Sequence, residues 1–140
     1  MTEAGAQGSA GLVAAARARV RDLSADALAQ AQAAGALVVD VRERDELRAS
    51  GMIPGALHVP RGVLEFVADP ASPQHHPAFE RARPVVLYCA VGGRSALAAD
   101  ALRQLGFTDV AHLGDGFTGW VADGLPTASV GAESDAKPPR

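Results

Sequence analysis

Cys89 is the single cysteine among 140 residues, and its position favours a nucleophilic role. An apolar run at 85–88 leads into it, and a glycine-containing loop follows before a helical pattern begins at Ser95. Such a loop turns backbone N–H groups toward one point, and the dipole of the next helix adds positive potential there. Both effects favour the thiolate, the reactive form of cysteine. Lone cysteines are more often buried apolar side chains, but the Gly-Gly-Arg-Ser that follows favours a reactive site. The expected binding loop is Ala90, Val91, Gly92, Gly93, Arg94 and Ser95.

The interval between Cys89 and Arg94 separates two kinds of chemistry. Cysteine-dependent phosphatases share this layout but place five residues between the nucleophile and an arginine that holds phosphate bidentately. Here four residues intervene, and Ser95 occupies the place of that arginine. A shorter loop encloses a smaller volume, which suits one extra sulfur atom better than a phosphoryl group. The interval therefore favours sulfur transfer over phosphoryl transfer.

Strand and helix patterns alternate along the chain, which predicts an α/β layer fold with a mainly parallel sheet. In such folds sites form beyond the carboxyl ends of strands, where Cys89 would lie. Short apolar runs predict strands at 37–39, 57–59, 85–88 and 109–113. Helices are expected at 12–20, from the N-cap Ser24 to Gly35, from the charged residues after Asp40 to Gly51, at 63–67, at 95–105 and after 114–116.

Composition excludes several functional classes. The length suits one domain, and a net charge of −3 gives no overall attraction to nucleic acid or to an anionic membrane. No apolar run is long enough to span a membrane, and the N-terminus lacks a secretory signal, so we expect a cytoplasmic protein. One cysteine excludes an internal disulfide, so a sulfur held on Cys89 must pass to another molecule.

Four segments together resemble the rhodanese family of sulfurtransferases. They are residues 37–43 (LVVDVRE), 51–56 (GMIPGA), 89–95 (CAVGGRS) and 113–120 (LGDGFTGW), and the likeness extends over about 23–125. It implies a three-layer fold with a central five-stranded sheet flanked by helices, and a double displacement through a persulfide on Cys89. The implied division is an N-terminal extension at 1–20, partly helical or disordered, a rhodanese domain at 21–125 and a disordered tail at 126–140.

The resemblance also implies the partners of the reaction. The donor would be thiosulfate or a persulfide, and the acceptor a thiol, cyanide or a protein partner, with no cofactor. Two other functions remain open: a non-catalytic rhodanese-like module that binds or regulates a partner, and a small cysteine phosphatase.

Two departures from the family pattern affect these expectations. Met52 replaces the histidine that commonly precedes Ile-Pro-Gly-Ala, so any polar contact of that histidine is lost. Ala90 and Val91 are uncharged where relatives that favour thiosulfate often have cations, which predicts weak capture of a small dianion. A protein or low-molecular-weight persulfide is then the better donor.

Arg94 has two alternative roles in this interpretation. It either neutralises the bound anion or turns away to pair with a carboxylate and brace the loop. Asp40 and Arg42 follow the strand at 37–39 and would lie near the active-site side, where we expect a scaffold role rather than a catalytic one.

The remaining chemistry-bearing side chains are assigned no catalytic or metal role. The histidines lack the spacing of a metal site, the two aromatic residues of the fourth segment are expected to pack in the core, and a basic cluster either docks a partner or forms a solvated face. These residues are His58, His75, His76 and His112, then Phe117 and Trp120, and finally Arg17, Arg19 and Arg21.

Overall fold

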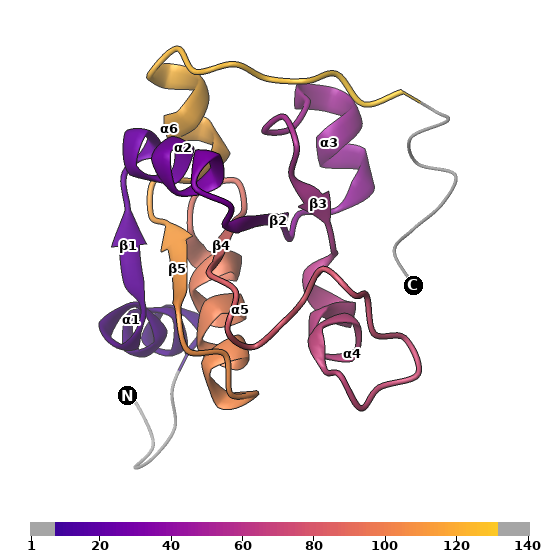
Figure 1. Cartoon of the computed structure of the whole chain (residues 1–140). Coiled ribbons are helices and arrows are strands. Elements are labelled where there is room, and N and C mark those ends of the chain that lie inside the picture. The colour runs from indigo at the N-terminus through magenta and orange to yellow at the C-terminus, as the bar shows by residue number, and fades with distance from the viewer. Residues whose placement is uncertain (1–7, 132–140) are drawn as a thin grey trace.

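Five parallel strands form the central layer of the protein, with helices on both sides (Figure 1). The computed structural model describes residues 8–131, and all statements on the structure concern these residues. The strand order is β1-β5-β4-β2-β3, and every pairing between them is parallel. The strands are β1 (Arg21–Leu23), β2 (Leu37–Asp40), β3 (Leu57–His58), β4 (Val85–Tyr88) and β5 (Val110–Leu113). The helices are α1 (Ser9–Arg19), α2 (Ala25–Ala33), α3 (Arg44–Ser50), the 3-10 turn η1 (Arg61–Val63), α4 (Leu64–Ala68), α5 (Gly93–Gln104) and α6 (Gly116–Ala122).

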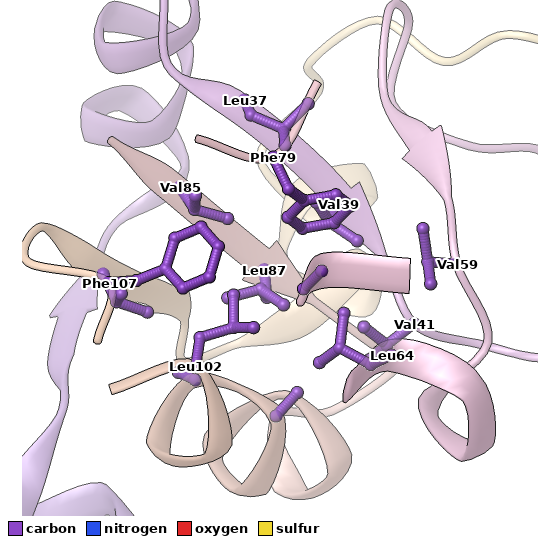
Figure 2. Close-up of a cluster of buried hydrophobic side chains, with 14 of the residues drawn as sticks. Leu37, Val39, Val41, Val59, Leu64, Phe79, Val85, Leu87, Leu102 and Phe107 are labelled. Atoms are coloured by element: carbon purple, nitrogen blue, oxygen red, sulfur yellow. The ribbon is translucent and has the colours of Figure 1, made fainter. Parts of the chain in front are cut away.

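The two faces of the sheet have separate hydrophobic cores. Successive side chains of a strand point to opposite faces, so Val39 and Leu87 join one core while Val38 and Val86 join the other. Helices α4 and α5 cover the first core, which Figure 2 shows, and α2 and α6 cover the second. Burial of each such side chain contributes about 1.5–3 kcal/mol. This explains why β2 and β4 are apolar along their whole length rather than at alternate positions.

Local signals in the sequence set the helix ends that surround the site. The Ser24 hydroxyl accepts a hydrogen bond from the Ala27 N–H at 3.1 Å and begins α2, as expected. Helix α3 begins with a reciprocal capping box between Glu43 and Glu46. It ends at Gly51, whose φ of 82° favours glycine.

Three parts of the structure differ from the sequence expectations. Strand β1 was not predicted, and α5 begins at Gly93 rather than Ser95. At the expected start of the disordered tail, Pro126 accepts a hydrogen bond from Trp120 Nε1, and Ala128 pairs with Met52 through two backbone hydrogen bonds. The tail therefore begins with an ordered segment. Its remainder at 132–140 lies outside the described residues.

The N-terminal extension includes helix α1, which packs against α5. Ala16 on α1 is fully buried, and Arg19 forms a bidentate pair with Asp100 on α5 at 2.7 and 3.0 Å. Residues 1–7 of the extension lie outside the described part. None of the described helices is long and apolar enough to cross a membrane.

Candidate active site

The sulfur of Cys89 lies just after β4, where N–H groups of the following loop converge on it. Cys89 Sγ accepts hydrogen bonds from the N–H of Gly92 at 3.1 Å and from that of Ser95 at 3.4 Å. Both donors belong to the start of α5, a helix of 12 residues whose dipole adds positive potential at this end. The residue is only 1% exposed. The arrangement is suited to hold an anionic sulfur, as the sequence predicted for this loop.

The start of α6 and the loop that precedes it fix the shape of the Cys89 loop. Phe117 N–H donates to the carbonyl of Cys89 at 2.8 Å, and Thr118 N–H donates to that of Ala90 at 3.1 Å. Gly92 has a φ of 103°, and a Cβ at this position would overlap the carbonyl oxygen of Gly114. Only glycine permits this backbone and this close approach together.

Arg94 points away from the sulfur and pairs with a carboxylate. Its Nη1 and Nη2 donate to Glu46 Oε2 and Oε1 at 2.8 and 2.9 Å. The hydrogen bond from Arg94 is the main reason that the pKa of Glu46 is lowered from 4.5 to about 2. Of the two roles left open by the sequence, the structure shows the brace, which ties the Cys89 loop to α3.

Asp40 and Arg42 form a buried pair beside the loop, in agreement with a scaffold role. Arg42 Nη2 lies 2.7 Å from Asp40 Oδ2, and the two residues are 2% and 0% exposed. The same guanidinium donates to Ser50 Oγ at 3.0 Å and to the Gly51 carbonyl at 2.7 Å, and it stacks 4.3 Å from the centre of the Phe117 ring. These contacts join the end of β2 to the end of α3 and to α6.

His112 is the residue of the site that the sequence analysis missed. Its Nδ1 lies 2.9 Å from Ser95 Oγ, and Ser95 Oγ lies 3.6 Å from Cys89 Sγ. Burial lowers the pKa of His112, which is 1% exposed. The available signal was its place as the one polar residue of a buried strand, at the position paired with Leu87.

A pocket of about 420 Å³ opens beside the loop. Four apolar side chains contribute to its wall, and both of its charged side chains are already in ion pairs with other residues. The pocket therefore offers a mainly apolar approach to the Cys89 loop. It is lined by Arg42, Glu46, Ala49, Ser50, Ala90, Phe117, Thr118 and Val121.

The structure places the remaining histidines and aromatic residues in structural contacts. His58 Nε2 lies 2.7 Å from the Arg42 carbonyl, whereas His75 and His76 bond to backbone groups of their own loop. Phe117 and Trp120 are buried in the second core, as predicted, although Phe117 also lines the pocket.

The three arginines near the N-terminus are exposed to solvent, and each also contacts another part of the fold. Arg19 pairs with Asp100, and Arg21 Nη2 lies 3.2 Å from Asp109 Oδ1. Arg17 Nη2 lies 3.4 Å from the carbonyl oxygen of Val91 and so contacts the Cys89 loop.

Comparisons with known proteins agree with this geometry. A family model described as a rhodanese-like domain matches residues 24–123. The chain is 34% identical over 109 residues to a sulfurtransferase of Allochromatium vinosum, a match that covers 76% of this chain and 94% of that relative. These matches confirm the resemblance that the four sequence segments predicted.

Solved structures share the fold. A protein of unknown function from Rhodopseudomonas palustris, described as a possible tyrosine phosphatase, is 34% identical with a TM-score of 0.83, and the match covers 91% of this chain and 99% of that one. The polysulfide-sulfur transferase homodimer of Wolinella succinogenes is 30% identical with a TM-score of 0.68, and the match covers 90% of each chain. The five-stranded three-layer fold is thereby confirmed.

Proposed function

Since the chain belongs to the family of rhodanese-like domains, we propose that it is a sulfurtransferase that holds a sulfane sulfur on Cys89 as a persulfide. The observation that supports this most directly is the pair of N–H groups from Gly92 and Ser95 aimed at Cys89 Sγ. Donors placed in this way stabilise an anionic sulfur before and after transfer. The sulfurtransferase of Allochromatium vinosum and the polysulfide-sulfur transferase of Wolinella succinogenes agree with this class of reaction.

The reaction balances as two displacements. In the first, Cys89 thiolate attacks the outer sulfur of a donor, the bond between that sulfur and the donor breaks, and the rest of the donor leaves with the electron pair. With thiosulfate the leaving group is sulfite, and with a persulfide it is a thiolate. In the second, an acceptor thiolate or cyanide attacks the outer sulfur of the Cys89 persulfide and returns Cys89 thiolate. Two easier steps replace one difficult step.

The surroundings of the loop support an uncharged or weakly charged donor over thiosulfate. Ala90 and Val91 provide no charge, Arg94 is engaged by Glu46, and the pocket at Ala90 is mainly apolar. A small dianion gains little from such a wall. A persulfide on a peptide, a protein or a small thiol places apolar atoms against it. Because Cys89 is 1% exposed, the side chains around it must give way as the donor approaches.

The phosphatase alternative is disfavoured by Arg94. A phosphoryl group needs an arginine that offers its two nitrogens to the phosphate oxygens. Here both terminal nitrogens of Arg94 already bond to Glu46, and the loop is one residue shorter than phosphatases require. A non-catalytic binding module would not need the N–H donors that surround the sulfur.

Intact mass spectrometry tests the proposal. The protein is incubated with thiosulfate, with inorganic polysulfide and with glutathione persulfide, and the mass is recorded before and after addition of dithiothreitol. We expect one added sulfur atom, lost on reduction and absent in Cys89→Ser, with glutathione persulfide loading the protein faster than thiosulfate. A failure of all three donors to load the protein would reject it. Turnover of p-nitrophenyl phosphate dependent on Cys89, without sulfur loading, would establish the phosphatase instead.

A further inference from the structure

Behind the Cys89 loop lies a buried chain that runs from Cys89 to two side chains, Ser95 and His112, that the two displacements do not use. Cys89 Sγ contacts Ser95 Oγ at 3.6 Å, and Ser95 Oγ contacts His112 Nδ1 at 2.9 Å. The three residues are 1%, 0% and 1% exposed. They come from the end of β4, the first turn of α5 and the middle of β5. The contact therefore depends on tertiary packing and not on sequence proximity.

The hydrogen-bonding capacity of Ser95 determines how this chain can be arranged. A hydroxyl has one proton to donate and two lone pairs to accept with. The Gly92 carbonyl, 3.2 Å from Ser95 Oγ, can only accept, so it takes the hydroxyl proton while Cys89 is a thiol. The two lone pairs then accept the Cys89 S–H and a proton on His112 Nδ1. This arrangement satisfies all four groups with His112 in its neutral Nδ1–H form.

Loss of the proton from Cys89 changes two of these bonds and leaves the one from His112 Nδ1 in place. The anionic sulfur can no longer donate, and Ser95 can turn its proton from the Gly92 carbonyl to the sulfur. The turn requires that Ser95 Oγ stay in place and that His112 not take the same proton. A donor at Nδ1 meets both requirements, whereas an acceptor at Nδ1 would compete with the sulfur for the proton.

We propose that His112 is a positioning residue, which donates its Nδ1 proton to Ser95 and so directs the Ser95 hydroxyl to the anionic sulfur of Cys89. The proposal rests on the proposed function for its role in turnover, because both the thiolate and the persulfide are anionic. The direct contact with the sulfur belongs to Ser95. His112 acts through it.

The surroundings of His112 lower the pKa of its imidazole and so favour the neutral form. Burial is the largest effect on its pKa and lowers it, Asp22 on β1 raises it, and Arg17 on α1 lowers it. Asp22 is paired in register with His112 and accepts the Gly114 N–H at 2.8 Å. From the Cys89 loop and α5, the group that faces His112 is the Ser95 hydroxyl. A neutral imidazole at neutral pH can donate through one nitrogen, as the proposal requires.

A matched pair of variants tests the position of the donor. In His112→Asn the side-chain amide can occupy the place of Nδ1, and in His112→Gln it reaches the place of Nε2. The readout is the rate of Cys89 alkylation by iodoacetamide as a function of pH, with Ser95→Ala as reference. We expect His112→Gln and Ser95→Ala to move the midpoint upward by about one pH unit, which is about tenfold slower alkylation below it. We expect His112→Asn to stay within about threefold of the wild type.

The proposal would be overturned if the pH profiles of alkylation were equal for His112→Gln and the wild type. It would also be overturned if His112→Asn and His112→Gln moved the midpoint equally. The ¹⁵N chemical shifts of His112 in the wild-type protein supply a test that needs no variant. A proton on Nδ1 near neutral pH is expected, and a proton only on Nε2 would overturn the proposal. Neither measurement requires a sulfur donor. If the proposed function is wrong, the intact-mass experiment shows no sulfur loading. The alkylation and ¹⁵N results still test the role of His112 in that case.

Discussion

The ion pair between Arg94 and Glu46 gives the account a quantitative test. Replacement of Glu46 by Gln removes the charge but keeps an oxygen that can accept the Glu43 N–H of the capping box, which Glu46 accepts at 2.8 Å. Arg94 keeps its position in the chain but loses its ionic partner. The variant therefore removes the ion pair with Arg94 and keeps the capping box at the start of α3.

The expected loss of stability follows from the pKa of Glu46. The fall from 4.5 to about 2 would correspond to about 3 kcal/mol for a group shielded from solvent, at 1.36 kcal/mol per pH unit. The side chains of Arg94 and Glu46 are 39% and 34% exposed, so solvent screening reduces this to about 1 kcal/mol. In a domain of this size the melting temperature should fall by about 3–5 °C at pH 7.

The pH dependence has a definite sign. A carboxyl whose folded-state pKa is lowered contributes its full stability above its ordinary pKa and loses it as the pH falls through the folded-state value. The difference in melting temperature between wild type and Glu46→Gln should therefore be constant above pH 4.5 and shrink as the pH falls toward 2.

Thermal denaturation followed by circular dichroism, at pH values from about 3 to about 7, measures this difference in melting temperature. Arg94→Ala serves as the second variant and should melt lower than the wild type at pH 7. The reasoning would be refuted if both variants melted with the wild type while their KM for thiosulfate rose. That outcome would assign Arg94 to anion capture instead of bracing.

Three further changes test other parts of the site. Gly92→Ala should destabilise the fold by about 2 kcal/mol or more and abolish sulfur loading, because the φ of Gly92 is 103°. Gly93→Ala is the matched control and should have only a small effect, because the nearest atom lies 3.9 Å from the new Cβ. Urea denaturation and intact mass spectrometry compare the two variants, and equal effects would contradict the loop geometry. Arg42→Lys keeps the charge but not the bidentate contact with the buried Asp40, so urea denaturation should show a loss of about 3 kcal/mol, and a loss below about 0.5 kcal/mol would disprove the scaffold role. Ala90→Arg adds a cation at the pocket and should lower the KM for thiosulfate about threefold or more at low salt. This fall in KM should become smaller as the salt concentration rises. A fall in KM that does not depend on salt would show that charge is not its cause.

The elements with strong local signals could be predicted from the sequence. Ser24 begins α2 through its own hydroxyl, and the apolar run 85–88 could hardly be anything but a buried strand before Cys89. The expectation that N–H groups of this loop surround the Cys89 sulfur followed from this local context. Residues that act through neighbours in the chain are visible to sequence analysis because the spacing itself brings them together.

The features that were not predicted depend on partners far away in the sequence. Strand β1 is three residues long with no apolar alternation, and it exists through its pairing with β5, about 90 residues further on. The choice between the two roles of Arg94 depended on Glu46, which is 48 residues away. His112 looked like a lone histidine because only the packing of β5 against α5 brings it to Ser95.

The most direct test of the central claim is a single transfer from isolated, loaded protein. The protein is treated with a persulfide donor, freed of the donor by gel filtration and then mixed with cyanide, and thiocyanate is counted against the amount of loaded chain. The account predicts one thiocyanate for each loaded Cys89, with the original mass restored and none formed by Cys89→Ser. Thiocyanate formed equally by Cys89→Ser, or a loaded sulfur that no acceptor removes, would contradict it.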